Sequence, residues 1–239
     1  MNLNNLFSAA LTFVAASCNQ ANKQPCDDHF IRGNNYALSF EFDKAAGEFN
    51  AATKEDPQNA FAWYGKAAID QLNGDLDGAI AEYDSSLHAD PDFVLGYFHR
   101  AGVYAQKGRH KKAIDDMDEV IKRKPDFFYA FYLRATYQND LGNIKEAIAD
   151  MSKAILINPN SSDAWYYHGI FNGEIKNYPQ AIADIDKAIE LKTDRVTAYT
   201  IKGYYEYLSG EKDSACADFS IGKFLGDSRA RLYIDKYCK

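Results

Sequence analysis

A step of 34 residues recurs along this chain and constrains its fold more than any other feature. Alanine occupies one register of that step in six successive copies: Ala45, Ala79, Ala113, Ala147, Ala181 and Ala215. Proline recurs at the same step in Pro57, Pro91, Pro125 and Pro159, and Thr193 and Asp227 continue that register. Agreement over so many copies indicates an internal repeat, in which each unit buries its apolar side against its neighbours.

Two further registers hold small residues, and a third holds aromatic ones. The small registers are Gly33, Ala67, Ala101, Ala135, Gly169, Gly203 and Ala52, Ser86, Val120, Ala154, Ala188, Gly222. The aromatic register is Trp63, Tyr97, Phe131, Trp165 and Tyr199, with His29 as its first member. Small residues let helix backbones approach closely. We expect the aromatic register to fill the space between helices, which would explain much of the 14% aromatic content.

Within one copy the apolar spacing is helical. The first run of the third copy places Tyr97, Ala101 and Tyr104 on one helix face. Gly108 then interrupts the pattern, as expected after a helix C-terminus. A second run of helical spacing follows and stops at Pro125. Each copy is therefore expected to form two antiparallel helices joined by a short turn.

These residues resemble the tetratricopeptide repeat, whose pattern is aromatic, small residue, Tyr, Ala, aromatic, Ala and Pro. The second copy carries it in Trp63, Ala67, Ala79, Tyr83 and Pro91, and the first in Gly33, Tyr36, Ala45, Phe49, Ala52 and Pro57. The resemblance implies an all-α solenoid, a right-handed superhelix of six helix pairs. The expected copies span 26–59, 60–93, 94–127, 128–161, 162–195 and 196–229.

A capping helix is expected within 227–239, because a repeat array needs a polar outer end. Leu232 is its expected contact with the last repeat, with Tyr233 and Ile234 as alternatives, and Gly226 would end the preceding helix. Cys216 and Cys238 would lie near each other there. They could form a disulfide in an oxidising compartment, but the sequence favours two free thiols.

The N-terminus has the pattern of an export signal. An apolar run over 6–16 precedes Ala15-Ala16-Ser17-Cys18, which resembles the lipobox of bacterial lipoproteins. That resemblance implies a signal peptide over 1–17, lipid on Cys18, a polar tether over 18–25 and an outer-membrane location. An ordinary cleaved signal, giving a periplasmic protein, and a cytoplasmic chain remain the alternatives.

Charge argues against some classes of partner and has a structural explanation within the repeat. The formal net charge of −7 disfavours nucleic-acid binding. A basic register lies on the expected first helices: Arg32, Lys66, Arg100, Arg134, His168 and Lys202. An acidic register lies on the second helices: Glu48, Glu82, Asp116, Asp150, Asp184 and Asp218. We favour interhelical ion pairs for these two registers over an anion-binding ladder.

No motif for catalysis, a metal or a phosphate occurs in the sequence. We therefore expect no enzyme, no cofactor, no metal and no small-molecule substrate. The basic run Lys107–Lys112 falls on an expected turn and is read as solvated charge.

In the resembled family the first helices line a groove for a peptide or a partner helix. The residues expected to line it are aromatic or apolar: Phe61, Tyr64, Leu95, Phe98, Tyr129, Tyr132 and Tyr166, with Tyr204 and Tyr207 in the last copy. Such a surface favours apolar or aromatic side chains of a protein partner. The alternative for any one of these residues is packing between neighbouring helices. The function expected from the sequence is a non-catalytic, membrane-anchored binding scaffold, with a soluble adaptor or a self-associating array as alternatives.

Overall fold

The computed structural model describes residues 28–239, and every regular element within that range is a helix. The predicted signal, Cys18 and the tether lie outside the described residues. The thirteen described helices form two compact units, one ending at Lys124 and the other starting at Pro125. The expected all-α architecture of helix pairs is confirmed for this part of the chain.

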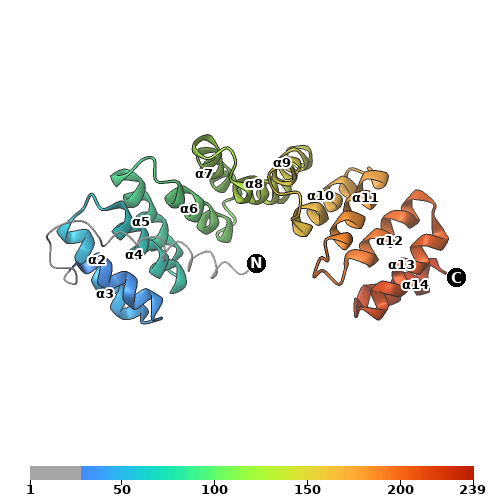
Figure 1. The fold of residues 1–239 in the computed structure, drawn as a ribbon, viewed down its shortest axis with the longest axis horizontal. Coiled ribbons are helices and arrows are strands. Elements are labelled where there is room, and N and C mark those ends of the chain that lie inside the picture. The colour runs from blue at the N-terminus through green and yellow to red at the C-terminus, as the bar shows by residue number, and fades with distance from the viewer. Residues whose placement is uncertain (1–27) are drawn as a thin grey trace. The chain divides into compact units, whose positions relative to one another are not determined.

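The first unit contains three helix hairpins (Figure 1). They are α2 (His29–Leu38) with α3 (Phe42–Glu55), α4 (Ala60–Leu72) with α5 (Leu76–Ala89), and α6 (Val94–Gln106) with α7 (His110–Arg123). Helix α3 also packs against α4, and α5 packs against α6. Each hairpin in this unit therefore covers an apolar side of the next.

The second unit contains three further hairpins and a terminal helix. They are α8 (Phe128–Asp140) with α9 (Ile144–Ile157), α10 (Ser162–Glu174) with α11 (Tyr178–Glu190), and α12 (Ala198–Ser209) with α13 (Lys212–Phe224). The terminal helix is α14 (Ser228–Tyr237), which packs on α13 and α12.

A left-handed residue reverses the chain inside every hairpin. Glycine supplies it in four of them, at Gly74, Gly108, Gly142 and Gly210, with φ between 67° and 91°. Phe40 and Lys176 occupy the same register and adopt φ of 61° and 63°. A residue with a Cβ is strained in this conformation, so the turn geometry of the hairpin overrides local preference at these two positions.

The core of each hairpin matches a large side chain on its second helix to a small residue on its first. The large residues are fully buried: Phe49, Tyr83, Met117, Met151, Ile185 and Phe219. A Cβ added to Gly33 would lie 2.8 Å from the Phe49 ring, and one on Gly203 would lie 2.9 Å from the carbonyl oxygen of Ala215. The small register is therefore required by the close approach of the two helices.

The aromatic register packs beside the loop between successive hairpins, and most of its members are only half-buried. The indole Nε1 of Trp63 donates to the carbonyl oxygen of Pro57 at 2.9 Å, and Trp165 does the same to Pro159 at 2.9 Å. These residues therefore tie the proline loops to the following helix. Trp165 also packs against the core cluster of Tyr166, Ile185, Ala188 and Ala198, so it both fills space between helices, as expected, and fastens the loop.

Helix α14 covers the end of the second unit through Tyr233, one of the expected alternatives, and through Tyr237, rather than through Leu232. Leu232 is 65% exposed. In contrast, the ring centre of Tyr233 lies 5.3 Å from that of Phe219, and the ring centre of Tyr237 lies 4.2 Å from that of Tyr207. A disulfide joins Cys216 of α13 to Cys238, so the structure contains the bond rather than the two free thiols that the sequence favoured. Gly226 has φ 97° and follows the end of α13.

Among the described helices none combines the length and the apolar character that crossing a bilayer would require.

Candidate functional site

The charged registers meet inside the hairpins as ion pairs. Each basic residue of a first helix contacts the acidic residue sixteen positions later on its second helix. The pairs are Arg32–Glu48 (3.0 Å), Lys66–Glu82 (2.6 Å), Arg100–Asp116 (2.6 Å), Arg134–Asp150 (2.6 Å), His168–Asp184 (2.7 Å) and Lys202–Asp218 (3.2 Å). The structural interpretation of these registers is confirmed, because each basic side chain is already engaged by a carboxylate of its own hairpin.

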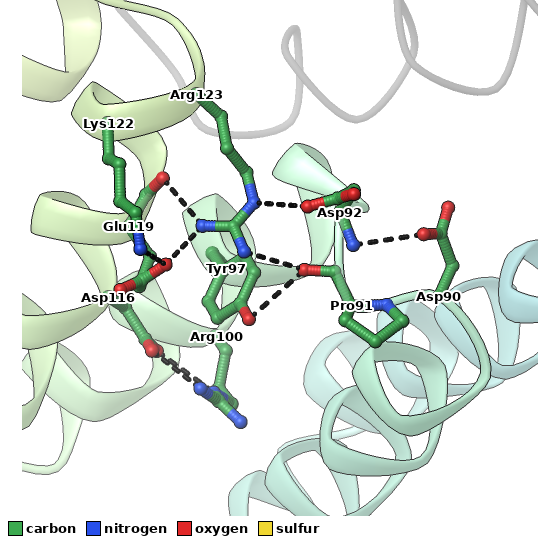
Figure 2. A network of polar contacts seen from close by, with 9 residues as sticks. All are labelled: Asp90, Pro91, Asp92, Tyr97, Arg100, Asp116, Glu119, Lys122 and Arg123. Carbon is green, nitrogen blue, oxygen red and sulfur yellow. Dashed lines mark hydrogen bonds and ion pairs between the residues drawn. The ribbon is translucent and has the colours of Figure 1, made fainter.

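Figure 2 shows how such charges hold the third hairpin together. The Arg100 guanidinium donates from Nε to Asp116 Oδ2 at 2.9 Å and from Nη2 to Oδ1 at 2.6 Å. Burial raises the pKa of the Asp116 carboxyl, while the hydrogen bonds from Arg100 act in the opposite direction. A bidentate pair of this kind fixes the angle between two helices as well as their separation.

A second arginine in Figure 2 fastens the loop that joins the second hairpin to the third. Arg123 of α7 donates to Asp92 Oδ1 at 3.1 Å and to the carbonyl oxygen of Pro91 at 2.9 Å. Its guanidinium also lies 4.8 Å from the centre of the Tyr97 ring and pairs with Glu119. This network is explained by packing of the first unit, so it is not a candidate for ligand binding.

The expected groove residues of the first unit divide into exposed and buried ones. Phe61 is 43% exposed and packs 4.8 Å from the Phe93 ring, and Leu95 is half-buried. Tyr64 and Phe98 are only 5% and 4% exposed. These two side chains belong to the core, and their assignment to a ligand-binding surface is corrected here.

In the second unit the aromatic residues of two first helices gather into one surface. The ring centre of Tyr132 on α8 lies 5.7 Å from that of Phe128 and 5.9 Å from that of Tyr167 on α10. The ring centres of Phe128 and Tyr129 are 5.0 Å apart. All four rings are half-buried, so each keeps part of its surface in water. We call Phe128, Tyr129, Tyr132 and Tyr167 the aromatic surface. Tyr166 was also expected here, but it is 6% exposed and belongs to the core.

Arg195 is a member of this site that the sequence did not indicate. Its guanidinium carbon lies 4.7 Å from the centre of the Tyr167 ring and 4.9 Å from that of Tyr166. Its Nε donates to Asp163 Oδ1 at 2.9 Å. Burial opposes the positive charge, but Tyr167 and Asp163 outweigh that effect and raise the pKa of Arg195.

The position of Arg195 follows from an irregular connection between α11 and α12. Helix α11 ends at Glu190 and α12 begins at Ala198, whereas α9 ends at Ile157 and α10 already begins at Ser162. Thr193 stands in this longer loop where four other copies have proline. The absence of proline at this position is the signal in the sequence that this loop differs from the other loops between hairpins. The loop also borders a cavity of about 210 Å³ lined by Ile189, Val196, Tyr199 and Leu225.

Three carboxylates surround Lys202 of the sixth hairpin, and two of them, Asp218 and Glu206, are buried. The Lys202 ammonium lies 2.8 Å from Asp186, 3.2 Å from Asp218 and 3.6 Å from Glu206. Burial, followed by the charge of Asp218, raises the pKa of Glu206 to about 7. One cation thus faces three acids, and this environment suppresses the ionisation of Glu206.

Residues 28–239 contain no cluster of three or more His, Cys, Asp or Glu side chains arranged to hold a metal ion. The possible lipidation site, Cys18, lies outside the described residues.

Comparisons with known proteins agree with this architecture. The tetratricopeptide repeat family model matches residues 39–92, 71–126 and 100–164, which together make up more than half of the chain. No curated protein sequence matches this chain.

Solved structures with a similar fold include three at low sequence identity. YrrB, described as a TPR protein with an unusual peptide-binding site, has 20% identity and a TM-score of 0.70, covering 79% of this chain and 97% of its own. MamA has 24% identity and a TM-score of 0.65, covering 69% of this chain and 96% of its own. PilF of Pseudomonas aeruginosa has 15% identity and a TM-score of 0.71, covering 88% and 96%. At sequence identities of 15–24%, the similarity to these structures establishes the fold alone.

Proposed function

Because this chain belongs to the tetratricopeptide repeat family, whose members are generally non-catalytic scaffolds for protein–protein interaction, we propose that it binds a protein partner through the aromatic surface of its second unit. The observation that carries this proposal is the set of half-buried rings on α8 and α10. Hairpin packing buries the large core residues completely but leaves these four rings partly in water.

The chemistry of the surface favours a peptide or helix with aromatic or apolar side chains. Tyrosine rings offer flat apolar area together with hydroxyl groups, which suits them to interfaces that are only partly dry. Arg195 adds a guanidinium held in place by Tyr167 and Asp163, so its orientation is settled before a partner arrives. Preorganisation of this kind lowers the entropy cost of binding. Peptide binding by the structurally similar YrrB supports the same class of ligand.

A displayed peptide library selected on the purified chain tests the proposal. We expect enriched peptides to carry aromatic or large apolar residues. The Tyr129→Ala, Tyr132→Ala double variant should weaken the binding of such a peptide by at least about tenfold, since buried aromatic anchors dominate interfaces. Phe224→Ala is the matched control, because this ring is 89% exposed on α13, outside the aromatic surface.

The result has a clear contrary outcome. If the double variant keeps its helical circular dichroism and binds the selected peptide as tightly as the parent, the aromatic surface is not the binding site. Loss of binding in the Phe224→Ala control alone would move the site to α13.

We further propose that lipid on Cys18 attaches the chain to a membrane. The run Ala15-Ala16-Ser17-Cys18 after an apolar stretch supports this proposal. Two or more acyl chains give firm attachment, whereas a single chain gives weak attachment. Mass spectrometry of the Cys18 peptide from cell membranes should show an acylated N-terminal cysteine. Recovery of an unmodified peptide that still includes Met1 would exclude it.

A further inference from the structure

Helix α14 is a first helix that has no second helix of its own within the described residues. Tyr233 stands one repeat step after Tyr199, so α14 continues the register of the first helices. Each other first helix forms a hairpin with the helix that follows it, but α14 packs only on α13 and, less extensively, on α12. Its attachment to the unit is correspondingly one-sided.

Helix α14 is held on the second unit mainly through its tyrosines, which pack on the rings of Tyr204, Tyr207 and Phe219. Ala230 is its one fully buried residue, while Leu232 is 65% exposed. Tyr233 stacks on Tyr204 at 5.4 Å, and Tyr237 lies 4.2 Å from Tyr207. A helix of ten residues is marginal in water by itself, so α14 depends on this contact and on its covalent link.

The covalent link is the disulfide between Cys216 and Cys238. It joins the second turn of α13 to the residue that ends α14, at the opposite end from the Gly226 turn. The helix is thus tethered at both ends, and only one of the two tethers is part of the backbone. In the second to fifth hairpins the register of Cys216 holds isoleucine, at Ile80, Ile114, Ile148 and Ile182.

The disulfide is placed where thiol exchange is possible. Both cysteines are half-buried, so neither is enclosed by the core. Lys212 precedes Cys216 by one turn, and its ammonium donates at 2.9 Å to the main-chain oxygen of Lys239, next to Cys238. Exchange requires that an attacking thiolate reach one of the two sulfurs, and the partial exposure of both cysteines allows this.

We propose that the Cys216–Cys238 disulfide is a reversible redox latch that holds α14 closed over Tyr204 and Tyr207. A dithiol reductant attacks one sulfur, breaks the S–S bond and forms a mixed disulfide, from which its second thiol releases the protein. The reductant loses two electrons and two protons and becomes a disulfide, and the protein gains two cysteine thiols. Helix α14 then detaches at its Cys238 end and uncovers the tyrosines of α12.

The consequence of opening concerns the last hairpin. Tyr204 and Tyr207 lie on α12, a first helix, at positions where the sequence predicts ligand-lining residues. Closed α14 occupies that face with its own tyrosines, so it acts as an internal competitor. This consequence rests on the proposed function, whereas the detachment of α14 does not.

Hydrogen exchange of the full chain, read by mass spectrometry with and without a dithiol reductant, tests the latch. We expect amide exchange in 228–237 to accelerate by at least about tenfold on reduction. A disulfide commonly lowers the equilibrium constant for opening of the segment it holds by more than about tenfold. Exchange in α4 should not change. The Cys216→Ser, Cys238→Ser variant retains the other two cysteines and should exchange rapidly in α14 whether or not reductant is present.

Two results would overturn the latch. One is unchanged protection of α14 in wild-type protein whose two cysteines have been shown by alkylation to be reduced. The other is full alkylation of both cysteines without reductant in natively exported protein, which would mean that the bond does not form. Neither result depends on whether the aromatic surface binds a peptide, so the two proposals fail separately.

Discussion

The guanidinium carbon of Arg195 lies 4.7 Å from the centre of the Tyr167 ring, while its Nε donates a hydrogen bond of 2.9 Å to Asp163. A residue from the loop before α12 is thereby fixed against two residues of α10. Because Tyr167 also contacts Tyr132 at 5.9 Å, the arginine supports the rings that form the aromatic surface.

Arg195→Ala should lower both the stability of the second unit and its affinity for a selected aromatic peptide. Loss of a partly buried cation–π contact is expected to reduce the free energy of unfolding by about 1 kcal/mol. Urea unfolding followed by Trp165 fluorescence in a Trp63→Phe background would measure it. Arg195→Lys keeps the positive charge but lacks the flat guanidinium. Its free energy of unfolding should lie between those of the parent and Arg195→Ala. Equal stability of the three proteins would show that the contact is energetically neutral.

Gly203→Ala should destabilise the sixth hairpin. The added methyl would lie 2.9 Å from the carbonyl oxygen of Ala215 and 3.0 Å from the Phe219 ring, so the two helices must separate. Overpacking of this kind costs about 1–3 kcal/mol. Gly102→Ala is the matched control, because nothing lies within 4 Å of its new methyl and alanine favours the helix by about 0.5–1 kcal/mol. Thermal unfolding by circular dichroism should shift in opposite directions for the two variants.

The stability of the first unit should fall on acidification because of His99. Burial lowers the pKa of His99 to about 4, below its usual 6.5, among the rings of Tyr64, Tyr83 and Phe98. The folded state therefore resists protonation that the unfolded state accepts. Stability is lost as the pH falls from about 6.5 towards 4, by up to about 3 kcal/mol.

His99→Gln should reduce the fall in the free energy of unfolding on acidification, whatever its effect on stability at neutral pH. Urea unfolding followed by Trp63 fluorescence in a Trp165→Phe background, at pH values between 7 and 4, measures how the free energy of unfolding of the first unit changes with pH. A variant as acid-sensitive as the parent would assign the loss to other groups.

Glu206 should give the second unit the opposite dependence. Its pKa is raised to about 7, so the folded state holds a proton that the unfolded state releases near the usual 4.5. Stability is therefore lost as the pH rises from about 4.5 to about 7. Glu206→Gln should be more stable than the parent at pH 8 and should show a smaller change over this range. Glu190→Gln, at a 65% exposed carboxylate, is the control and should leave the dependence unchanged.

Much of the fold could be predicted because the repeat makes each local pattern testable six times. The Ala45 register is buried in every hairpin, and each basic side chain in the register from Arg32 to Lys202 contacts its carboxylate. Both findings depend on residues of one hairpin, whose separation in the sequence is short and constant. Periodicity is a reliable guide at that range because the helix geometry itself sets which residues share a face.

The candidate site could be predicted only in part, because a register cannot tell a half-buried ring from a buried one. Tyr132 and Tyr166 occupy the same register on adjacent first helices, yet Tyr166 is 6% exposed and Tyr132 keeps more of its surface in water. The difference comes from what the next hairpin places against each ring, which the spacing within one copy does not contain.

The order of residues along this chain was enough to establish paired helices, their turns and the ion pairs within them, because these depend on contacts across a few turns of helix. The folded arrangement alone determined that Arg195 covers Tyr167, that Leu232 stays in water, and that Cys216 meets Cys238. Those contacts join irregular segments to neighbouring helices. Their geometry depends on how hairpins stack and on where a loop lacks its proline, and no repeating pattern encodes it.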